Sequence, residues 1–310
     1  MDRRPPFRLT ALDNAGFRRI LLALVGIPIA LVYLWRVVLL PLAFGTYLGD
    51  FQESYMRAAG RLAANLDPYD LCATAGCQEP TGPQYVMPPL LAWLLQPLVG
   101  VDSHVVAAAV VVVLNISLAV FLYCAIRALR VDDWQLAALL VITALSFEPV
   151  IGNIDEGQVN LVLLALSGLW LWSWIDGGWW GGVPLAAAVA LKIIQAPVGL
   201  LVLWGRRWAM LTAAVITGAA LWLVAAPGFL FEYLYKVLPV VSAGTGLYEN
   251  HSPGGTIARL FDPATFLGAD RGSPAPARVL TIFVALVALL ITLAVLRTPA
   301  RNRAGRGLEA

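Results

Sequence analysis

The fold is decided by an apolar stretch near the N-terminus, residues 20–44, which reads ILLALVGIPIALVYLWRVVLLPLAF. About 20 apolar residues are enough for a helix to cross a bilayer, so this stretch predicts a membrane span. The sequence GTYLGDFQESY, residues 45–55, follows directly and places the carboxylate of Asp50 where the chain leaves the membrane. Asp50 either caps the surface helix predicted over residues 51–64 or belongs to a functional cavity, and its position alone is compatible with both.

The composition of the whole chain is that of an all-α polytopic membrane protein. Hydrophobic residues make up 60% of the 310 residues and charged residues 13%, and the mean hydropathy is +0.77. Soluble domains are about half apolar and a quarter charged. The length has room for about eight membrane segments, and we expect one integral membrane domain over residues 1–310. The first apolar run is too long for the core of a cleavable signal peptide.

The distribution of arginine predicts the orientation in the membrane, because short cytoplasmic segments carry an excess of Lys and Arg. It places the tails 1–19 and 297–310 in the cytoplasm and makes residues 45–100 and 227–277 two large outer loops. In the first loop, one face of a surface helix is predicted to carry Phe51, Tyr55, Ala58, Ala59 and Leu62. Residues 86–100 are too short to span and predict a second juxtamembrane helix, with proline in its first turn.

Residues 182–204 allow two interpretations. They form either one span that carries Lys192, or two half-length helices that meet at residues 192–197. We favour the hairpin, because it returns Arg206 and Arg207 to the cytoplasm. Lys192 then lies at membrane depth and faces a cavity, since an isolated lysine there costs several kcal/mol.

Polar residues gather in four segments that this topology places at the outer face. They include Asp50; Asp67 and Tyr69 with Tyr85; Asn153, Asp155, Glu156, Gln158 and Asn160; and His251 followed by Arg259. Each segment alone is also explained by loop solvation or by turn-forming residues. Together with Lys192, the four favour a shared cavity.

Several other functions are disfavoured. A Walker A loop, a Gly-x-Gly-x-x-Gly motif and a His-Glu-x-x-His motif are all absent from the sequence. Two histidines, His104 and His251, are too few for a metal centre, so we predict neither metal nor cofactor, and no nucleic-acid partner. Cys72 and Cys77 form a disulfide if their loop is in an oxidising compartment and are otherwise free thiols, whereas Cys124 is expected to pack in an apolar helix.

A series of short motifs resembles the GT-C superfamily of polyprenyl-phosphate-sugar glycosyltransferases, and in particular glycosyltransferase family 87, the actinobacterial mannosyltransferase-like group. The motifs are Gly49-Asp50, Asp67-Pro-Tyr69, Tyr85-Val-Met-Pro-Pro-Leu90, residues 152–160 and Ala190-Leu-Lys192-Ile-Ile-Gln-Ala-Pro197. The resemblance extends over residues 20 to about 210 and loosens afterwards. Members of the family usually have more spans after the second outer loop. Asp155-Glu156 weakly resembles an acidic motif of metal-dependent GT-C enzymes.

The resemblance implies transfer of a sugar, often mannose, from a polyprenyl phosphate carrier to a lipid or glycan acceptor at the extracytoplasmic face of the cell membrane. It makes Asp50 the catalytic base. The cationic candidates for stabilising the leaving phosphate are Lys192, His251 and Arg259. Asn153, Gln158 and Asn160 are candidates for binding sugar hydroxyls, and Tyr69 and Tyr85 for stacking on sugar rings. The alternatives are a non-catalytic polyprenyl-sugar binding protein or flippase, and a transporter, although the matched broken helices of a transporter are not evident.

Overall fold

The computed structural model describes residues 14–69, 85–225, 227–239, 253–261 and 275–297, with the side chains described up to residue 292. These parts of the chain are helices joined by loops and contain no β-strand, which confirms the all-α prediction. Three helices are long and apolar enough to cross a membrane, and two bent helix pairs raise that number to five. Several shorter apolar helices are present as well, and the number of about eight membrane segments stays a prediction.

The first span is one helix that contains two π-helical turns. It is built from α1 (Ala15–Leu21), η1 (Leu22–Gly26), α2 (Ile27–Tyr33), η2 (Leu34–Leu39) and α3 (Leu40–Phe44). Prolines lie in the first turns of α2 and α3, directly after each π-helical segment. Proline donates no backbone hydrogen bond and clashes with the preceding turn. A π-bulge accommodates both defects without ending the helix.

Two further spans follow. Helix α6 (Ser103–Leu129) is apolar throughout and buries Cys124, which confirms that this cysteine packs in an apolar helix. The second consists of α7 (Trp134–Leu145) and α8 (Glu148–Asp155), which are bent by 52° relative to each other. Arg18 of α1 is buried, and it donates to Gln135 (3.1 Å) and to the carboxylate of Asp133. This contact holds the start of α1 beside the start of α7.

The hairpin predicted around Lys192 is confirmed. Its helices are α9 (Asn160–Asp176), α10 (Gly182–Leu191), η5 (Ile193–Gln195), α11 (Val198–Trp204) and α12 (Trp208–Val224). Helix α10 ends at Lys192, whose ammonium donates to Asn160 at the start of α9 (3.0 Å). Helix α11 then returns, because the Arg207 guanidinium lies 5.3 Å from the ring centre of Trp174 at the end of α9. Arg206 and Arg207 therefore lie at the end of the bundle where α9 ends.

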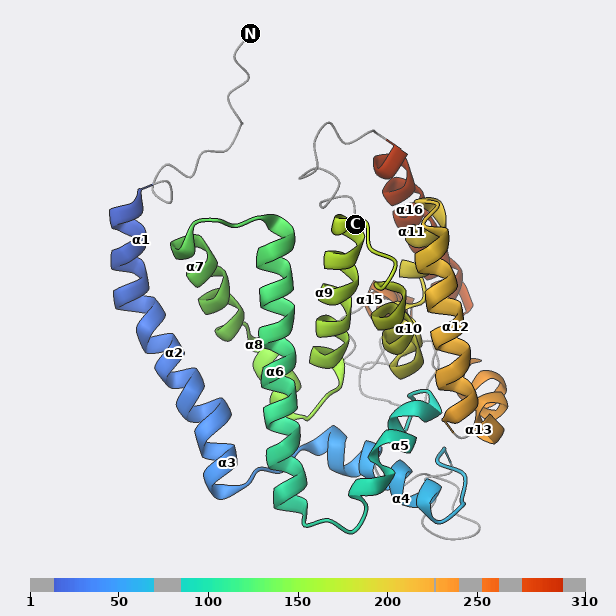
Figure 1. The fold of residues 1–310 in the computed structure, drawn as a ribbon. Helices are drawn as coiled ribbons and strands as arrows, with labels where there is room; N and C mark the ends of the chain where they lie inside the picture. The colour runs from blue at the N-terminus through green and yellow to red at the C-terminus, as the bar shows by residue number, and fades with distance from the viewer. Residues whose placement is uncertain (1–13, 70–84, 226, 240–252, 262–274, 298–310) are drawn as a thin grey trace.

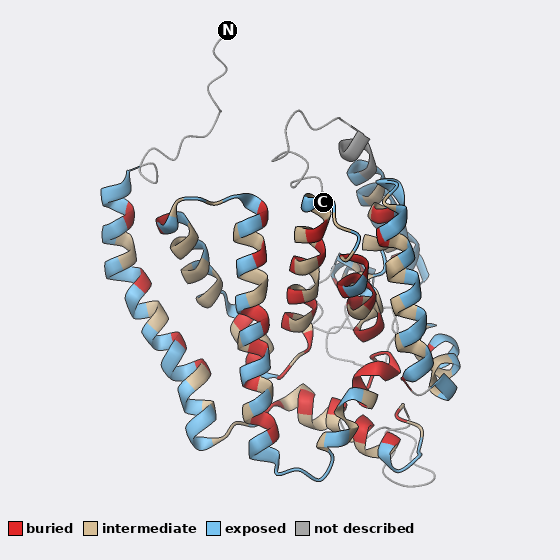
Figure 2. Cartoon of the chain, in the orientation of Figure 1, coloured by how far each residue is buried: buried red, intermediate tan, exposed pale blue. Residues whose placement is uncertain are grey.

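The predicted surface helix of the first loop is also present. It consists of η3 (Phe51–Met56) and α4 (Arg57–Ala63), followed by α5 (Pro89–Leu95) and η4 (Gln96–Leu98). All five residues predicted to share one face, from Phe51 to Leu62, are buried. Helix α5 is short and has proline in its first turn, as predicted. In Figure 2 these helices are among the more buried elements, whereas the first span is largely exposed, as a lipid-facing helix would be.

The remaining described helices belong to the second loop and the last span. Helices α13 (Pro227–Glu232) and η6 (Tyr233–Val237) follow α12. Tyr233 is buried against Tyr69 of the first loop, with ring centres 6.1 Å apart. Helix α15 (Pro253–Phe261) packs on α16 (Ala275–Arg297). The first loop and η6 therefore pack together through aromatic rings.

The bundle has two chemically different ends. Figure 1 shows the start of α1, the α6–α7 connection and the end of α9 at one end, and η3, α4 and α5 at the other. The first end carries arginines of the α1 start and of the α6–α7 and α11–α12 connections, including Arg19, Arg127 and Arg206. The second end carries Asp50. Arg18, Arg19, Arg127, Arg130, Arg206 and Arg207 lie at the first end, and Arg57 and Arg61 of α4 lie at the second. Arginine is thus more frequent at the end opposite the candidate site.

Candidate functional site

Asp50 lies at the start of the η3 helix and its side chain is partly buried. Its backbone is already helical (φ −60°, ψ −38°), and its side chain makes no capping hydrogen bond. Of the two alternatives for Asp50, the one in which its side chain caps this helix is therefore wrong. Instead, its Oδ2 accepts a hydrogen bond of 2.6 Å from Nε2 of Gln158, which is 108 residues away in the sequence. Asp50 is therefore bonded to a residue distant in the sequence and not to the backbone of its own helix.

A tight turn in the α8–α9 connection makes this contact possible. The backbone N–H of Phe51 donates to the carbonyl of Glu156 (3.1 Å). Gly157 has a φ of +67°, and a Cβ on it would lie 2.6 Å from Cβ of Phe51. Only glycine fits both the left-handed backbone and this close approach. The turn therefore holds Gln158 against Asp50.

Gly157→Ala is expected to destabilise the protein by at least about 1 kcal/mol, because an L-residue in the left-handed region costs roughly that much even without a clash. The matched control is Gly60→Ala, in the surface helix, where an added Cβ meets nothing within 4 Å and alanine favours the helix. Thermal unfolding in detergent checks both variants. Equal unfolding temperatures for the two would contradict the role given to this turn.

Four polar side chains form one continuous hydrogen-bonded chain from Asp50 to Lys192. Beyond the contact with Asp50, Gln158 accepts from Asn160 Nδ2 (2.7 Å) through its Oε1. Asn160 Nδ2 also donates to Asn153 Oδ1 (2.7 Å), and Asn160 Oδ1 accepts from the Lys192 ammonium (3.0 Å). Asn153 donates in turn to the Pro149 carbonyl (2.6 Å). Two predicted site clusters and Lys192 therefore meet through direct contacts.

The two ends of this chain fix its direction. An ammonium only donates and an ionised carboxylate only accepts, so each amide between them has one favourable orientation. One oxygen of Asp50 is held, while among the described residues its Oδ1 accepts no hydrogen bond. The ammonium of Lys192 uses one of its three donors in this network. A proton acceptor and a cation are thus both oriented and both have unused bonding capacity.

Tyr55 is a neighbour of Asp50 that the sequence patterns assigned only to the buried face of the surface helix. Burial and the nearby Asp50 carboxylate raise the pKa of Tyr55 to about 12. Its phenol is therefore neutral at physiological pH. Its ring packs edge-on against Phe51 and Tyr85, with centres 6.3 and 6.4 Å apart, so it forms the apolar side of the Asp50 environment.

The two tyrosines predicted to stack on sugar rings pack against each other and form hydrogen bonds with the backbone. Tyr85 is only 2% exposed. Its hydroxyl donates to the Pro88 carbonyl (2.7 Å) and accepts from the Ala92 N–H (3.0 Å). Tyr69 stacks on Tyr85 at 5.6 Å and donates to the Met87 carbonyl (3.2 Å). The ring of Tyr85 offers no free face in this structure, which favours an architectural role over the predicted sugar contact.

Two cationic candidates remain, His251 and Arg259. His251 lies outside the described residues, as do Cys72 and Cys77. Arg259 lies on α15 and donates to Thr256 of the same helix (3.3 Å). Its role stays a prediction. Among the described residues, no group of three metal-binding side chains gathers at any position.

Comparison with known proteins supports a membrane enzyme. The model of glycosyltransferase family 87 matches residues 85–308, whereas no curated protein and no solved structure matches. Over residues 85 to about 210 the match agrees with the expected extent of the resemblance, whereas residues 20–84 lie before it. The expectation that the resemblance loosens after residue 210 is wrong, because the match continues to residue 308. Gln158, Asn160 and Lys192 lie inside the matched residues, and Asp50 lies before them.

Proposed function

The chain belongs to glycosyltransferase family 87, and from this premise we propose that this membrane glycosyltransferase takes mannose from a polyprenyl phosphate and uses Asp50 as its general base. The proposed acceptor is a hydroxyl of a lipid or glycan. The observation that carries the proposal is the hydrogen-bonded chain Asp50–Gln158–Asn160–Lys192. Because Asp50 lies outside the matched residues, its role is supported by these contacts and by the resemblance of Gly49-Asp50 to the family motif, not by the family match.

The transfer requires a base and a cation, and the hydrogen-bonded side chains from Asp50 to Lys192 include one of each. An acceptor hydroxyl is a poor nucleophile until a base removes its proton, and the unoccupied Oδ1 of Asp50 is suited to that step. The acceptor oxygen then bonds to the anomeric carbon of the sugar, and the bond from that carbon to the carrier phosphate breaks. The polyprenyl phosphate leaves as a stable anion, so a general acid is not required. Lys192 is proposed to balance the developing negative charge.

The orientation of the bundle supports an extracytoplasmic site. Arginine is more frequent at the end opposite Asp50, and the positive-inside rule assigns an arginine-rich end to the cytoplasm. The polyprenyl chain of the donor would lie in the outer leaflet, with its phosphate at the level of Asp50 and Lys192. On this proposal the substrate approaches from the membrane and not from the cytoplasm.

A donor panel tests the proposed chemistry. The purified chain in proteoliposomes is given polyprenyl phosphates that carry mannose or glucose, and separately the matching nucleotide sugars, with a lipid extract as acceptor. We expect sugar transfer from polyprenyl-phosphate mannose and none from nucleotide sugars. Transfer from nucleotide sugars alone would overturn the proposed donor class but leave the family membership intact.

Gln158 is proposed as a positioning residue for Asp50, in addition to the contact with sugar hydroxyls that was predicted for it. Gln158→Leu removes the donor to Asp50 and the acceptor for Asn160, and we expect kcat to fall about 10-fold or more, the factor that corresponds to about 1.4 kcal/mol. The unfolding temperature in detergent should change much less than the rate, because the substitution removes the orientation of Asp50 and leaves the helices in place. Gln96→Leu, on the η4 turn outside this chain of contacts, is the control. A fall in kcat that is accompanied by a comparable loss of stability would mean that Gln158 acts on the fold only.

A further inference from the structure

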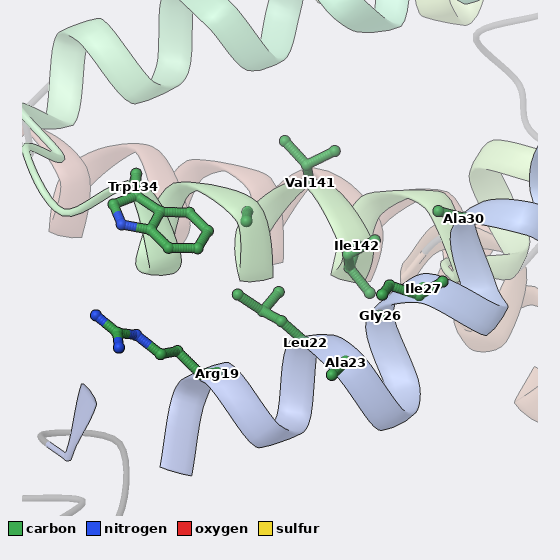
Figure 3. A pocket seen from close by; sticks show the side chains of 10 residues that line it. Arg19, Leu22, Ala23, Gly26, Ile27, Ala30, Trp134, Val141 and Ile142 are labelled. Atoms are coloured by element: carbon green, nitrogen blue, oxygen red, sulfur yellow. The ribbon is translucent and has the colours of Figure 1, made fainter. Parts of the chain in front are cut away.

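An apolar groove lies between the first span and α7, at the end of the bundle opposite Asp50. Its volume is about 610 Å³, and its lining includes Leu22, Gly26, Ala138 and Ile142. Figure 3 shows these two helices on either side of the groove, with Arg19 and Trp134 together at one end. The lining is almost entirely apolar apart from Arg19. Such a groove in a membrane-spanning bundle faces lipid.

Two contacts between the first span and α7 bound the groove. At the end that carries Arg19 and Trp134, the side chain of Arg18 donates to Asp133 and Gln135. Deeper in the bundle, Gly26 lets the helices approach each other, because a Cβ on it would lie 3.3 Å from Ile142. Between these contacts the side chains leave a space that protein atoms do not fill. An empty space of this kind forfeits dispersion contacts, and an apolar one does not hold water well.

The charge at the mouth of the groove identifies the head group. Arg18 forms an ion pair with Asp133. The side chain of Arg19 is exposed, and in the described part of the chain no ion pair includes it. Arg127 and Arg130 lie near the end of α6 at the same end of the bundle, and Asp132 and the paired Asp133 lie in the α6–α7 connection. The net charge of these side chains is positive. Tryptophan such as Trp134 is typical of the level of lipid head groups.

We propose that this groove binds an anionic phospholipid, with one acyl chain between the first span and α7 and the phosphate beside Arg19. The apolar lining accommodates the chain, and the guanidinium forms strong paired hydrogen bonds with a phosphate. The lipid would fix the position of the first span, which packs on the rest of the bundle over little of its surface. This site is separate from the chain of polar residues at Asp50, so it stands or falls independently of the proposed reaction.

Native mass spectrometry tests the proposal on the full chain released from nanodiscs that contain equal amounts of phosphatidylglycerol and phosphatidylcholine. The wild type is expected to retain phosphatidylglycerol preferentially. Arg19→Gln is expected to lower that preference about five-fold, since one basic side chain contributes about 1 kcal/mol to attraction of an anionic lipid. Arg206→Gln makes the same charge change in the α11–α12 connection, at a residue that does not line the groove, and is expected to retain the preference.

A second variant tests the groove itself. Ala138→Leu places additional methyl groups between the helices and is expected to reduce retention of both lipids. Photo-reactive acyl chains should cross-link to α2 and α7 in the wild type. No preference for phosphatidylglycerol in the wild type, or equal effects of Arg19→Gln and Arg206→Gln, would overturn the proposal. Cross-links from this groove to a second copy of the chain in place of lipid would do so as well.

Discussion

Asp50→Asn is expected to lower sugar transfer by about 10²–10⁴-fold, the usual contribution of a positioned general base. The substitution is nearly isosteric, and its Oδ1 still accepts from Gln158 Nε2, so the hydrogen-bonded chain and the fold should persist. Only the ability to take a proton is lost. Initial rates with the polyprenyl-phosphate sugar at saturating donor measure the effect, and thermal unfolding in detergent verifies the fold.

Asp155→Asn is the matched control for this variant. Asp155 is also at the end of the bundle that carries Asp50, and it is paired with Arg36 at 3.7 Å, with both side chains largely exposed. Exposed ion pairs contribute little to stability, so this variant should keep nearly full activity. Comparable losses in Asp50→Asn and Asp155→Asn would mean that general negative charge, and not a specific base, is what matters.

Lys192→Met is expected to lower kcat by about 10²–10³-fold, as removal of one group that stabilises developing negative charge commonly does. The variant keeps a flexible chain of similar length but removes the cation from the end of α10. It also leaves Asn160 Oδ1 without its donor, which frees the amide to turn and weakens the orientation of Gln158. Steady-state kinetics should show the loss mainly in kcat, because the charge develops as the phosphate leaves.

Lys236→Met provides the comparison for the lysine variant. Lys236 lies on η6, is exposed, and pairs with Glu232 one turn earlier at 2.8 Å. Its loss should change neither the rate nor the stability beyond about 0.5 kcal/mol, the usual range at a surface site. If Lys192→Met retained full activity with a normal fold, charge stabilisation by this residue would have to be abandoned.

The sequence predicted those features that local chemistry determines. The length of residues 20–44 specifies a span, the spacing from Phe51 to Leu62 specifies a buried face, and the arginines at 206 and 207 favour the hairpin at Lys192. Each of these depends on periodicity, on length or on the energy of a charge in a membrane. The structure agrees with all three.

The features that depend on tertiary contact were less predictable. An aspartate at the start of a helix often caps it. The carboxylate of Asp50 instead accepts a hydrogen bond from Gln158. An aromatic ring such as that of Tyr85 is suited to stacking on a sugar. In the structure, however, Tyr85 is buried and its hydroxyl forms hydrogen bonds with two backbone groups. Gly157 was the feature of the sequence that could have indicated the turn that holds Gln158. Only the structure shows that this glycine lies against Phe51.

The most direct test of the central claim measures the fate of the donor in proteoliposomes that contain the wild-type chain. Polyprenyl-phosphate mannose labelled in both the sugar and the phosphate is added with acceptor, and the two labels are followed separately. If the chain is a glycosyltransferase that works through Asp50, the sugar label appears in the acceptor with an equal amount of free polyprenyl phosphate, and Asp50→Asn binds the donor but releases neither. Donor that is bound, or moved across the bilayer, with both labels still joined would contradict this account.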